Sequence, residues 1–262
     1  MDEIKNPNAR IILFTSCKGG VGKSTVCANL AMSMALRGRR VLVIDCDFGS
    51  RCIDLIAGFS DRAVYDIGDA VLGRVPPEKA VVKDYRSPNL FFIAAPYSVD
   101  AQMNLFSFKR TIAAYATSGR YDYIFIDTPG GAGDPLMYAS AVADTAYIIT
   151  SCTKASIRAA DKTAAFLYAK GVGRTRLIIN KMMGKSTKRA KIDLINIIDS
   201  AAVKLIGVIP FDPELIFAGD EGKLTDELYS TNITRAFDNL ARRTEGENVP
   251  LFHKIRRLRK LR

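Results

Sequence analysis

The sequence predicts an α/β domain built on a mostly parallel, twisted β-sheet with helices on both faces. Short apolar runs, each long enough for one buried strand, alternate with longer segments of helical periodicity. The runs are almost continuously apolar rather than alternating, which is typical of strands that are covered on both sides. The chain has 262 residues, 48% of them hydrophobic, so it is long enough to bury one substantial core.

The expected elements follow one another in a βα order. Strands are expected at residues 10–15, 40–45, 90–94, 122–127, 145–150, 175–180 and 204–208. Helices are expected near residues 23–37, 65–72, 101–118, 134–141, 155–170, 188–201, 212–217 and 231–243. Ligands of such sheets bind beyond the carboxyl ends of the strands, so motifs at those ends supply the candidate functional residues.

The composition limits the classes of function. A net charge of +11 favours an anionic partner. No apolar run reaches the ~18 residues of a membrane-spanning helix, and the polar first ten residues lack a signal-peptide core. The five cysteines are scattered and form no CxxC pair, which disfavours a zinc site or an iron–sulfur scaffold and fits a reducing cytosol.

The first expected strand leads directly into a glycine-rich turn, in the sequence IILFTSCKGGVGKST at residues 11–25. Glycines let successive backbone N–H groups point at phosphate oxygens, and the positive end of the next helix adds to their field. Lys23 is expected to reach the β- and γ-phosphates, and the Ser24 hydroxyl to hold Mg²⁺. A glycine turn that binds nothing, the alternative, does not account for this lysine and hydroxyl. The turn glycines are Gly19, Gly20 and Gly22.

Two aspartates follow the second expected strand, in the segment RVLVIDCDFGSRCIDL at residues 40–55. Asp45 and Asp47 stand where carboxylates can orient a water molecule or hold one that is bound to Mg²⁺. A charged cap at the end of a buried strand is the structural alternative.

A third motif, YDYIFIDTPGGAG at residues 121–133, has the pattern of a Walker B strand. Asp127 ends this strand and is expected to contact Ser24 and the waters of Mg²⁺. The residues that follow are expected to form a switch, a segment that responds to the γ-phosphate, and its glycines let a backbone N–H approach that phosphate. It is called the second switch because another is expected earlier in the chain. A plain strand followed by a glycine turn is the alternative. The switch residues are Thr128, Pro129, Gly130 and Gly131.

The segment KGGVGKST at residues 18–25 carries a second lysine, Lys18, and resembles the deviant Walker A motif of the MinD/ParA family of P-loop ATPases. The resemblance covers nearly the whole chain, and over residues 54–95 it follows the MinD-type branch. It implies ATP or ADP with Mg²⁺ as cofactors, and a nucleotide-sandwich dimer in which Lys18 reaches the partner subunit's phosphates. Cys17 stands where MinD-type loops usually have glycine, and a redox role for its thiol stays open.

The resemblance also implies roles for the other motif residues. Asp47 would position the attacking water, and Asp45 would support the metal and a first switch at residues 48–50. Asn180, a turn residue in the alternative interpretation, would read the adenine edge, and backbone near Pro210 would lie against the base. The implied catalytic residues are Lys18, Lys23 and Asp47, and the implied metal site comprises Ser24, Asp45 and Asp127. The implied nucleotide-binding residues are Lys18, Gly19, Gly20, Val21, Gly22, Lys23, Ser24, Thr25, Asn180 and Pro210.

The last fourteen residues, 249–262, contain six Lys/Arg and no acidic residue. On a helix, their apolar side chains gather on about one half of the circumference, with cations opposite or alongside. The pattern predicts an interfacial membrane helix attached to an ATPase domain at residues 1–248. A disordered basic tail and a DNA-binding arm are the alternatives. The apolar residues of the expected helix are Leu251, Phe252, Ile255, Leu258 and Leu261.

Together these features predict a MinD-type ATPase that dimerises on ATP, binds an anionic membrane and regulates placement of the division site, with release on partner-stimulated hydrolysis. The expected partners are a second copy, the membrane, an activating protein and an effector such as a division inhibitor. Its expected location is the cytoplasm and, with ATP, the inner face of the cell membrane. The rival functions are a flagellar-number regulator of the same superfamily and a ParA-type DNA-partition ATPase. For the latter, a basic cluster at residues 181–191 leaves DNA binding open.

Overall fold

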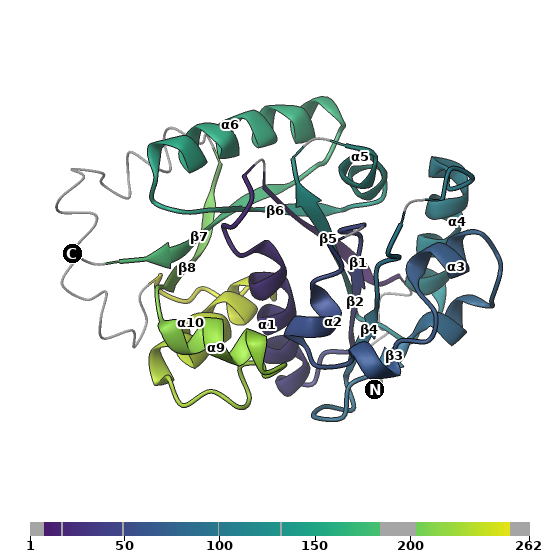
Figure 1. The fold of residues 1–262 in the computed structure, drawn as a ribbon. Coiled ribbons are helices and arrows are strands. Elements are labelled where there is room, and N and C mark those ends of the chain that lie inside the picture. The colour runs from purple at the N-terminus through teal and green to yellow at the C-terminus, as the bar shows by residue number, and fades with distance from the viewer. Residues whose placement is uncertain are drawn as a thin grey trace, which may run out of the picture.

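The structure is a computed structural model that describes residues 8–16, 18–48, 50–98, 100–131, 133–183 and 203–251. It confirms the expected architecture of a central sheet with helices on both faces (Figure 1). The strands are β1 (Arg10–Ser16), β2 (Val41–Asp45), β3 (Val82–Lys83), β4 (Leu90–Ile93), β5 (Tyr123–Gly130), β6 (Thr145–Thr150), β7 (Thr175–Met182) and β8 (Leu205–Pro210). The helices are α1 (Lys23–Leu36), α2 (Ile53–Ile56), α3 (Ile67–Val71), α4 (Leu105–Thr117), α5 (Asp134–Ser140), α6 (Lys154–Ala169), α9 (Pro213–Asp220) and α10 (Thr231–Thr244).

The eight described strands form one sheet in the order β3-β4-β2-β5-β1-β6-β7-β8. Every pairing among them is parallel except that of β3 with β4. All seven expected strands are present. The structure adds β3, whose two residues are too few to give a sequence pattern, and the single turn of α2. The expected helix at 188–201 lies outside the described residues.

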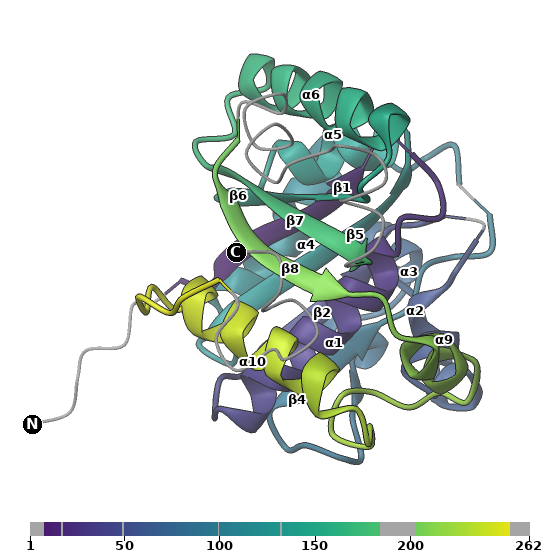
Figure 2. The same cartoon turned by 90° about the vertical axis from the view of Figure 1, so that its left-hand side faces the viewer.

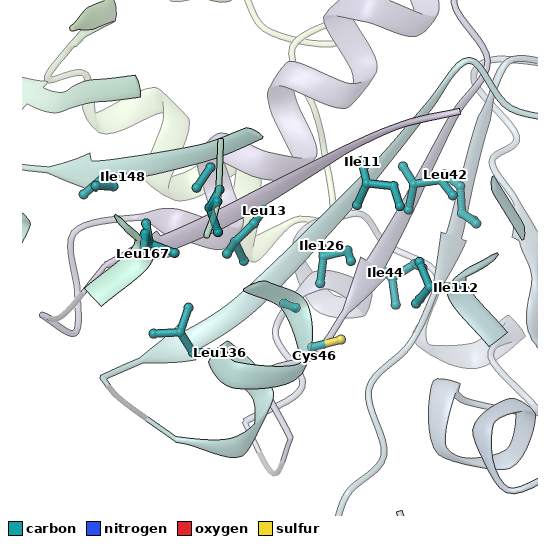
Figure 3. Close-up of a cluster of buried hydrophobic side chains, with 14 of the residues drawn as sticks. Ile11, Leu13, Leu42, Ile44, Cys46, Ile112, Ile126, Leu136, Ile148 and Leu167 are labelled. Carbon is teal, nitrogen blue, oxygen red and sulfur yellow. The ribbon is translucent and has the colours of Figure 1, made fainter. Parts of the chain in front are cut away.

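The core consists of two layers, one on each face of the sheet. Along β1, Ile11 and Leu13 point into the first layer, whereas Ile12 and Phe14 point into the second, as expected for successive residues of a strand. Side chains of α4, α5 and α6 complete the first layer, part of which is shown in Figure 3. Helices α1 and α10 complete the second layer, on the opposite face from α6 (Figure 2). Burial on both faces explains why the strands are almost continuously apolar.

Arg86 joins two loops that are distant from each other in the sequence. Its guanidinium donates to both carboxylate oxygens of Asp84, at 2.7 and 3.0 Å. It also donates to the carbonyls of Ala57 and Gly222, at 2.7 and 2.9 Å. The Arg86 side chain is only 4% exposed and that of Asp84 is fully buried. This buried clamp joins the loop after α2 to the loop after α9.

Removing the Arg86 side chain is expected to lower the free energy of unfolding by about 3–5 kcal/mol, because Asp84 would keep a buried charge without a partner. Arg86→Ala should therefore move the urea midpoint far below that of the unchanged protein. Arg74→Ala is the matched control, because Arg74 pairs with Asp69 and Asp100 at the surface and should leave the midpoint unchanged. Equal midpoints for the two variants would contradict a stabilising role of the clamp.

Candidate nucleotide-binding site

The glycine-rich turn between β1 and α1 forms a loop at the carboxyl edge of the sheet. Gly20 and Gly22 have φ angles of +74° and +87°, the left-handed region that favours glycine. The Ser16 hydroxyl donates to the Lys18 carbonyl at 2.8 Å, which fixes the start of the loop. The loop then passes directly into α1, whose N-cap is Gly22. The backbone therefore has the bend that a phosphate cradle requires.

Two residues at the end of β7 hold this phosphate loop from outside. The Asn180 side-chain amide donates to the Val21 carbonyl at 2.8 Å, and the Lys181 ammonium donates to the Gly20 carbonyl at 2.8 Å. The side-chain oxygen of Asn180, Oδ1, accepts a hydrogen bond from the Lys181 backbone N–H at 2.9 Å. Asn180 thus supports the phosphate loop, a role that the sequence interpretation missed. Its reading of the adenine edge stays a prediction.

Gly22 combines two requirements for glycine. A Cβ at this position would lie 2.5 Å from the Asn180 amide nitrogen, in addition to the strain of the positive φ. Gly38 has nearly the same φ, +85°, but open space where its Cβ would be. Gly22→Ala and Gly38→Ala should both lose about 1–2 kcal/mol of stability from backbone strain.

Only Gly22→Ala is expected to weaken nucleotide binding, by roughly tenfold or more, because it displaces the Asn180 support of the loop. Titration with a fluorescent ATP analogue and urea unfolding measure the two effects separately. Equal nucleotide affinity in the two alanine variants would show that the contact with Asn180 does not shape the site.

Asp127 lies at the base of the phosphate loop and is fully buried. The Ser24 hydroxyl donates to one of its carboxylate oxygens at 2.5 Å, as the sequence predicts. The other oxygen, Oδ1, is buried and has no hydrogen-bond partner among the described residues. Such an orphaned oxygen needs a donor or a cation, and Mg²⁺ keeps its own waters while it takes few protein ligands. Ser24 and Asp127 therefore fit a hydrated Mg²⁺ that is held between the loop and a bound triphosphate.

Asp45 is the second fully buried carboxylate, paired in register with Asp127 across β2 and β5. Its two oxygens accept the backbone N–H groups of Asp47 and Ile53, at 2.8 and 3.0 Å. The carboxylate therefore closes the turn of residues 45–53, which contains the expected first switch at residues 48–50. Asp45 also stays a predicted support for the metal through water. Gly49 of this switch lies outside the described residues.

The two buried aspartates oppose each other's ionisation. Burial raises the pKa of Asp127, and the charge of Asp45 raises it further, whereas Ser24 and Lys23 act in the opposite direction. Burial also raises the pKa of Asp45, against the two backbone N–H groups that it accepts. A cation beside the pair would relieve this repulsion, which agrees with the orphaned oxygen of Asp127.

The expected second switch begins as a continuation of β5, which runs on to Gly130. The Thr128 hydroxyl donates to the Phe14 carbonyl at 3.0 Å, and the Gly131 N–H donates to the Ser16 carbonyl at 3.1 Å. A Cβ on Gly130 would lie 3.2 Å from the nitrogen of Gly19. This segment, which includes Pro129, therefore lies directly against the phosphate loop in this state.

The two lysines of the phosphate loop lie in different surroundings. Lys23 is 7% exposed, and its charge acts on Asp127. Lys18 is exposed, and its ammonium lies 3.5 Å from the hydroxyl of Thr153, the N-cap residue of α6. One lysine is thus directed into the site, and the other lies on the outer surface of the loop.

A cavity of about 490 Å³ opens beside the phosphate loop. Its lining includes Gly22, Thr25, Asn180 and Pro210, four of the predicted nucleotide-binding residues. Phe211 and Cys52 also line it, and the sequence interpretation did not assign them to the site. Phe211 could have been assigned to the site from the sequence, because it is an apolar residue that directly follows Pro210. The cavity has the size and the apolar wall that a nucleobase requires.

The predicted membrane helix can be followed only at its first apolar residue. Leu251 is half-buried and packs against the first core layer. Phe252, Ile255, Leu258 and Leu261 lie outside the described residues. Within the described part of the chain, none of the helices has the length and apolar character needed to span a membrane. The same part contains no cluster of three or more His, Cys, Asp or Glu residues arranged to hold a metal ion.

Known proteins are similar in sequence to this chain over most of its length. A family model described as ParA, the NUBPL iron-transfer P-loop NTPase, matches residues 8–245. The septum site-determining protein MinD of Synechocystis sp. is 36% identical over 247 residues, which cover 92% of this chain and 91% of that protein. MinD of Bacillus subtilis is 31% identical over 242 residues, which cover 92% and 90% of the two chains.

Solved structures agree with the sequence comparisons. A chain of the MinC:MinD cell division protein complex of Aquifex aeolicus superimposes with a TM-score of 0.86 at 35% identity, covering 93% of this chain and 98% of that one. MinD of Pyrococcus horikoshii, complexed with Mg-ADP, gives a TM-score of 0.80 at 27% identity, with coverages of 90% and 96%. The chain therefore belongs to the MinD/ParA family of P-loop ATPases.

Proposed function

We propose that this protein is an ATP-driven switch that regulates where the cell divides. ATP joins two copies through their phosphate loops, the pair binds an anionic membrane through residues 249–262, and hydrolysis releases it. The similarity to septum site-determining proteins over 92% of the chain supports the division role. The similar Aquifex aeolicus structure is a MinC:MinD complex, which supports an effector protein as a partner. An activating protein that stimulates hydrolysis belongs to the same proposal.

Each residue of the site has a proposed task in hydrolysis. The loop N–H groups and Lys23 hold the phosphates, and Ser24 with Asp127 holds Mg²⁺, which neutralises charge on the β- and γ-phosphates when bound. Asp47 orients the attacking water toward the γ-phosphate. Lys18 stabilises the charge that develops on the partner subunit's transferring phosphoryl group. The Mg-ADP complex of the similar Pyrococcus horikoshii protein supports the choice of ligands.

The different surroundings of the two lysines carry the proposal. Lys23 is buried beside Asp127, so it already supplies the cation that its own phosphate loop needs. Lys18 lies on the outer surface, with one long contact to Thr153. A second cation at the rim of the loop has no task in its own site and can act on a nucleotide that faces it from another copy.

Pairing also explains how nucleotide controls membrane residence. Each cation near an anionic leaflet contributes on the order of 1 kcal/mol, so a single basic tail holds weakly. Two tails that are carried by one dimer bind far more tightly, because the second binds at a high effective concentration. Hydrolysis separates the tails and restores weak binding. The protein would thus lie on the inner face of the membrane with ATP and in the cytoplasm with ADP.

Co-sedimentation with anionic liposomes tests the membrane part of the proposal. The full chain should pellet with ATP and Mg²⁺ but remain soluble with ADP, and a chain lacking residues 249–262 should remain soluble with either nucleotide. Neutral phosphatidylcholine liposomes are the lipid control, because the cations then lack an anionic partner. Equal pelleting with ATP and ADP would contradict control by nucleotide.

The same assay with DNA separates the rival function. The plasmid-partition and ParA-family structures that share this fold do so at 19–20% identity, which supports the fold alone. ATP-dependent pelleting with DNA and none with anionic liposomes would replace the proposal by a DNA-partition role. A flagellar-number regulator would share the liposome result and differ only in the proteins that it binds.

A further inference from the structure

Arg51 is a buried arginine in an unfavourable backbone conformation directly after the first switch. Its φ is +44°, and the residue is 8% exposed. A side chain in the left-handed region is disfavoured, so this conformation persists only where the surroundings impose it. In the described part of the chain, the only other non-glycine residue with a positive φ is Lys181, which holds the phosphate loop. Lys181 contacts the phosphate loop directly, whereas Arg51 lies in the turn that the Asp45 carboxylate closes.

Three segments surround the Arg51 side chain. Its Nε donates to the Asp54 carboxylate at 2.6 Å, and the side chain of Asp54 is 3% exposed. Its guanidinium carbon lies 4.3 Å from the centroid of the Tyr97 ring, which belongs to the segment after β4. Its charge also acts on Asp66, the N-cap residue of α3. A carboxylate and an aromatic face together fix the guanidinium.

The backbone of Arg51 is joined to the residue that we propose as the orienter of water. The Arg51 N–H donates to the Asp47 carbonyl at 3.0 Å. The Asp47 N–H donates in turn to the buried Asp45 carboxylate at 2.8 Å. No hydrogen bond from a described residue reaches the Asp47 carboxylate itself. The backbone of Asp47 is therefore held on both sides, while its carboxylate is available to a ligand.

We propose that Arg51 is a positioning residue for Asp47. The clamp formed by Asp54 and Tyr97 keeps the guanidinium in place, and this fixes the left-handed conformation of Arg51, whose N–H holds the backbone of Asp47 next to Asp45. The inference rests on the proposed function, in which Asp47 orients the attacking water. The inference adds that the orientation of Asp47 depends on the aromatic ring of Tyr97, which lies outside the switch in the segment after β4.

Tyr97 is the part of the clamp that can be tested without opening the core, because the residue is 74% exposed. In the full chain, Tyr97→Leu should lower kcat for ATP hydrolysis about three- to tenfold, as the turn spends less time in its working conformation. KM for ATP should stay within about twofold, since the phosphate loop is unchanged. Tyr97→Phe keeps the ring and should restore kcat.

Tyr85→Leu is the matched control. Tyr85 is 67% exposed, and its ring faces two arginines that do not belong to the switch, with the guanidinium carbons of Arg86 and Arg62 at 4.9 and 5.5 Å from the centroid. This variant should keep the kcat of the unchanged protein. Thermal unfolding of all variants verifies that a lower kcat is not a loss of folded protein.

The outcomes separate this inference from the proposed function. If Asp47→Ala abolishes hydrolysis while Tyr97→Leu behaves like Tyr85→Leu, the positioning role of Arg51 is overturned and the proposed function is kept. If Tyr97→Phe is as slow as Tyr97→Leu, the aromatic ring is not the cause and the inference is again overturned. If Asp47→Ala hydrolyses ATP normally, the proposed role of Asp47 fails and the inference fails with it.

Discussion

Lys18→Ala is expected to bind ATP with nearly unchanged affinity and yet to remain a monomer. Lys18 lies on the outer surface of the phosphate loop, whereas Lys23 serves the loop's own nucleotide from a buried position. Removal of Lys18 therefore deletes a contact that only a second copy completes. ATP hydrolysis should fall on the order of a hundredfold or more, because a cation that stabilises the transition state is lost. Nucleotide titration, mass measurement by light scattering and a turnover assay test the three statements.

Two further lysine variants define the meaning of that result. Lys23→Ala should lose nucleotide binding itself, since Lys23 is buried next to Asp127. Lys109→Ala removes an exposed lysine on α4 and should change neither affinity nor mass. An ATP-dependent dimer of Lys18→Ala with normal turnover would refute the action of Lys18 across the interface.

Asp47→Ala is expected to give the opposite combination: ATP binding and dimerisation without hydrolysis. The Asp47 carboxylate carries the proposed task of orienting water, and its loss should lower turnover about 10²- to 10⁴-fold. The hydrogen bonds that build the switch use the backbone of Asp47, so an alanine keeps them. The dimer should therefore persist with ATP, and the protein should stay on anionic liposomes. Single-turnover hydrolysis and liposome retention over time measure the two effects.

An aspartate outside the site controls for the loss of charge alone. Asp61 is exposed in the turn Ser60–Arg62, and Asp61→Ala should keep the turnover of the unchanged protein. Asp47→Asn, which keeps the shape of the side chain, should be nearly as slow as Asp47→Ala. Normal turnover in Asp47→Ala, with the activating partner present, would remove Asp47 from the mechanism.

The sheet could be predicted from the sequence because its strands are buried on both faces. Almost continuously apolar runs such as RIILFT at residues 10–15 have few other uses in a chain of this length. The phosphate loop and Asp127 could also be predicted from the sequence, because the glycines, the lysine, the hydroxyl and the carboxylate follow strands at fixed spacings. The contact between Ser24 and Asp127 confirms the spatial part of that prediction.

The supports of the site could not be predicted because they join residues that are distant in the sequence. Asn180 and Val21 are 159 positions apart, and no local pattern shows that an amide of one meets a carbonyl of the other. The clamp of Arg86 on Ala57 and Gly222 is of the same kind. Arg51 carries no local signal for a left-handed conformation, since glycine, asparagine and aspartate are the residues that usually adopt it.

The mass of the protein in each nucleotide state tests the central claim most directly. Sedimentation of the Asp47→Ala full chain with ATP and Mg²⁺ should give twice the chain mass of 28.7 kDa, and sedimentation with ADP should give the single-chain mass. Adding Lys18→Ala to that variant should return the ATP sample to the single-chain mass. A single-chain mass with ATP, or a dimer that survives loss of Lys18, would contradict the proposed switch.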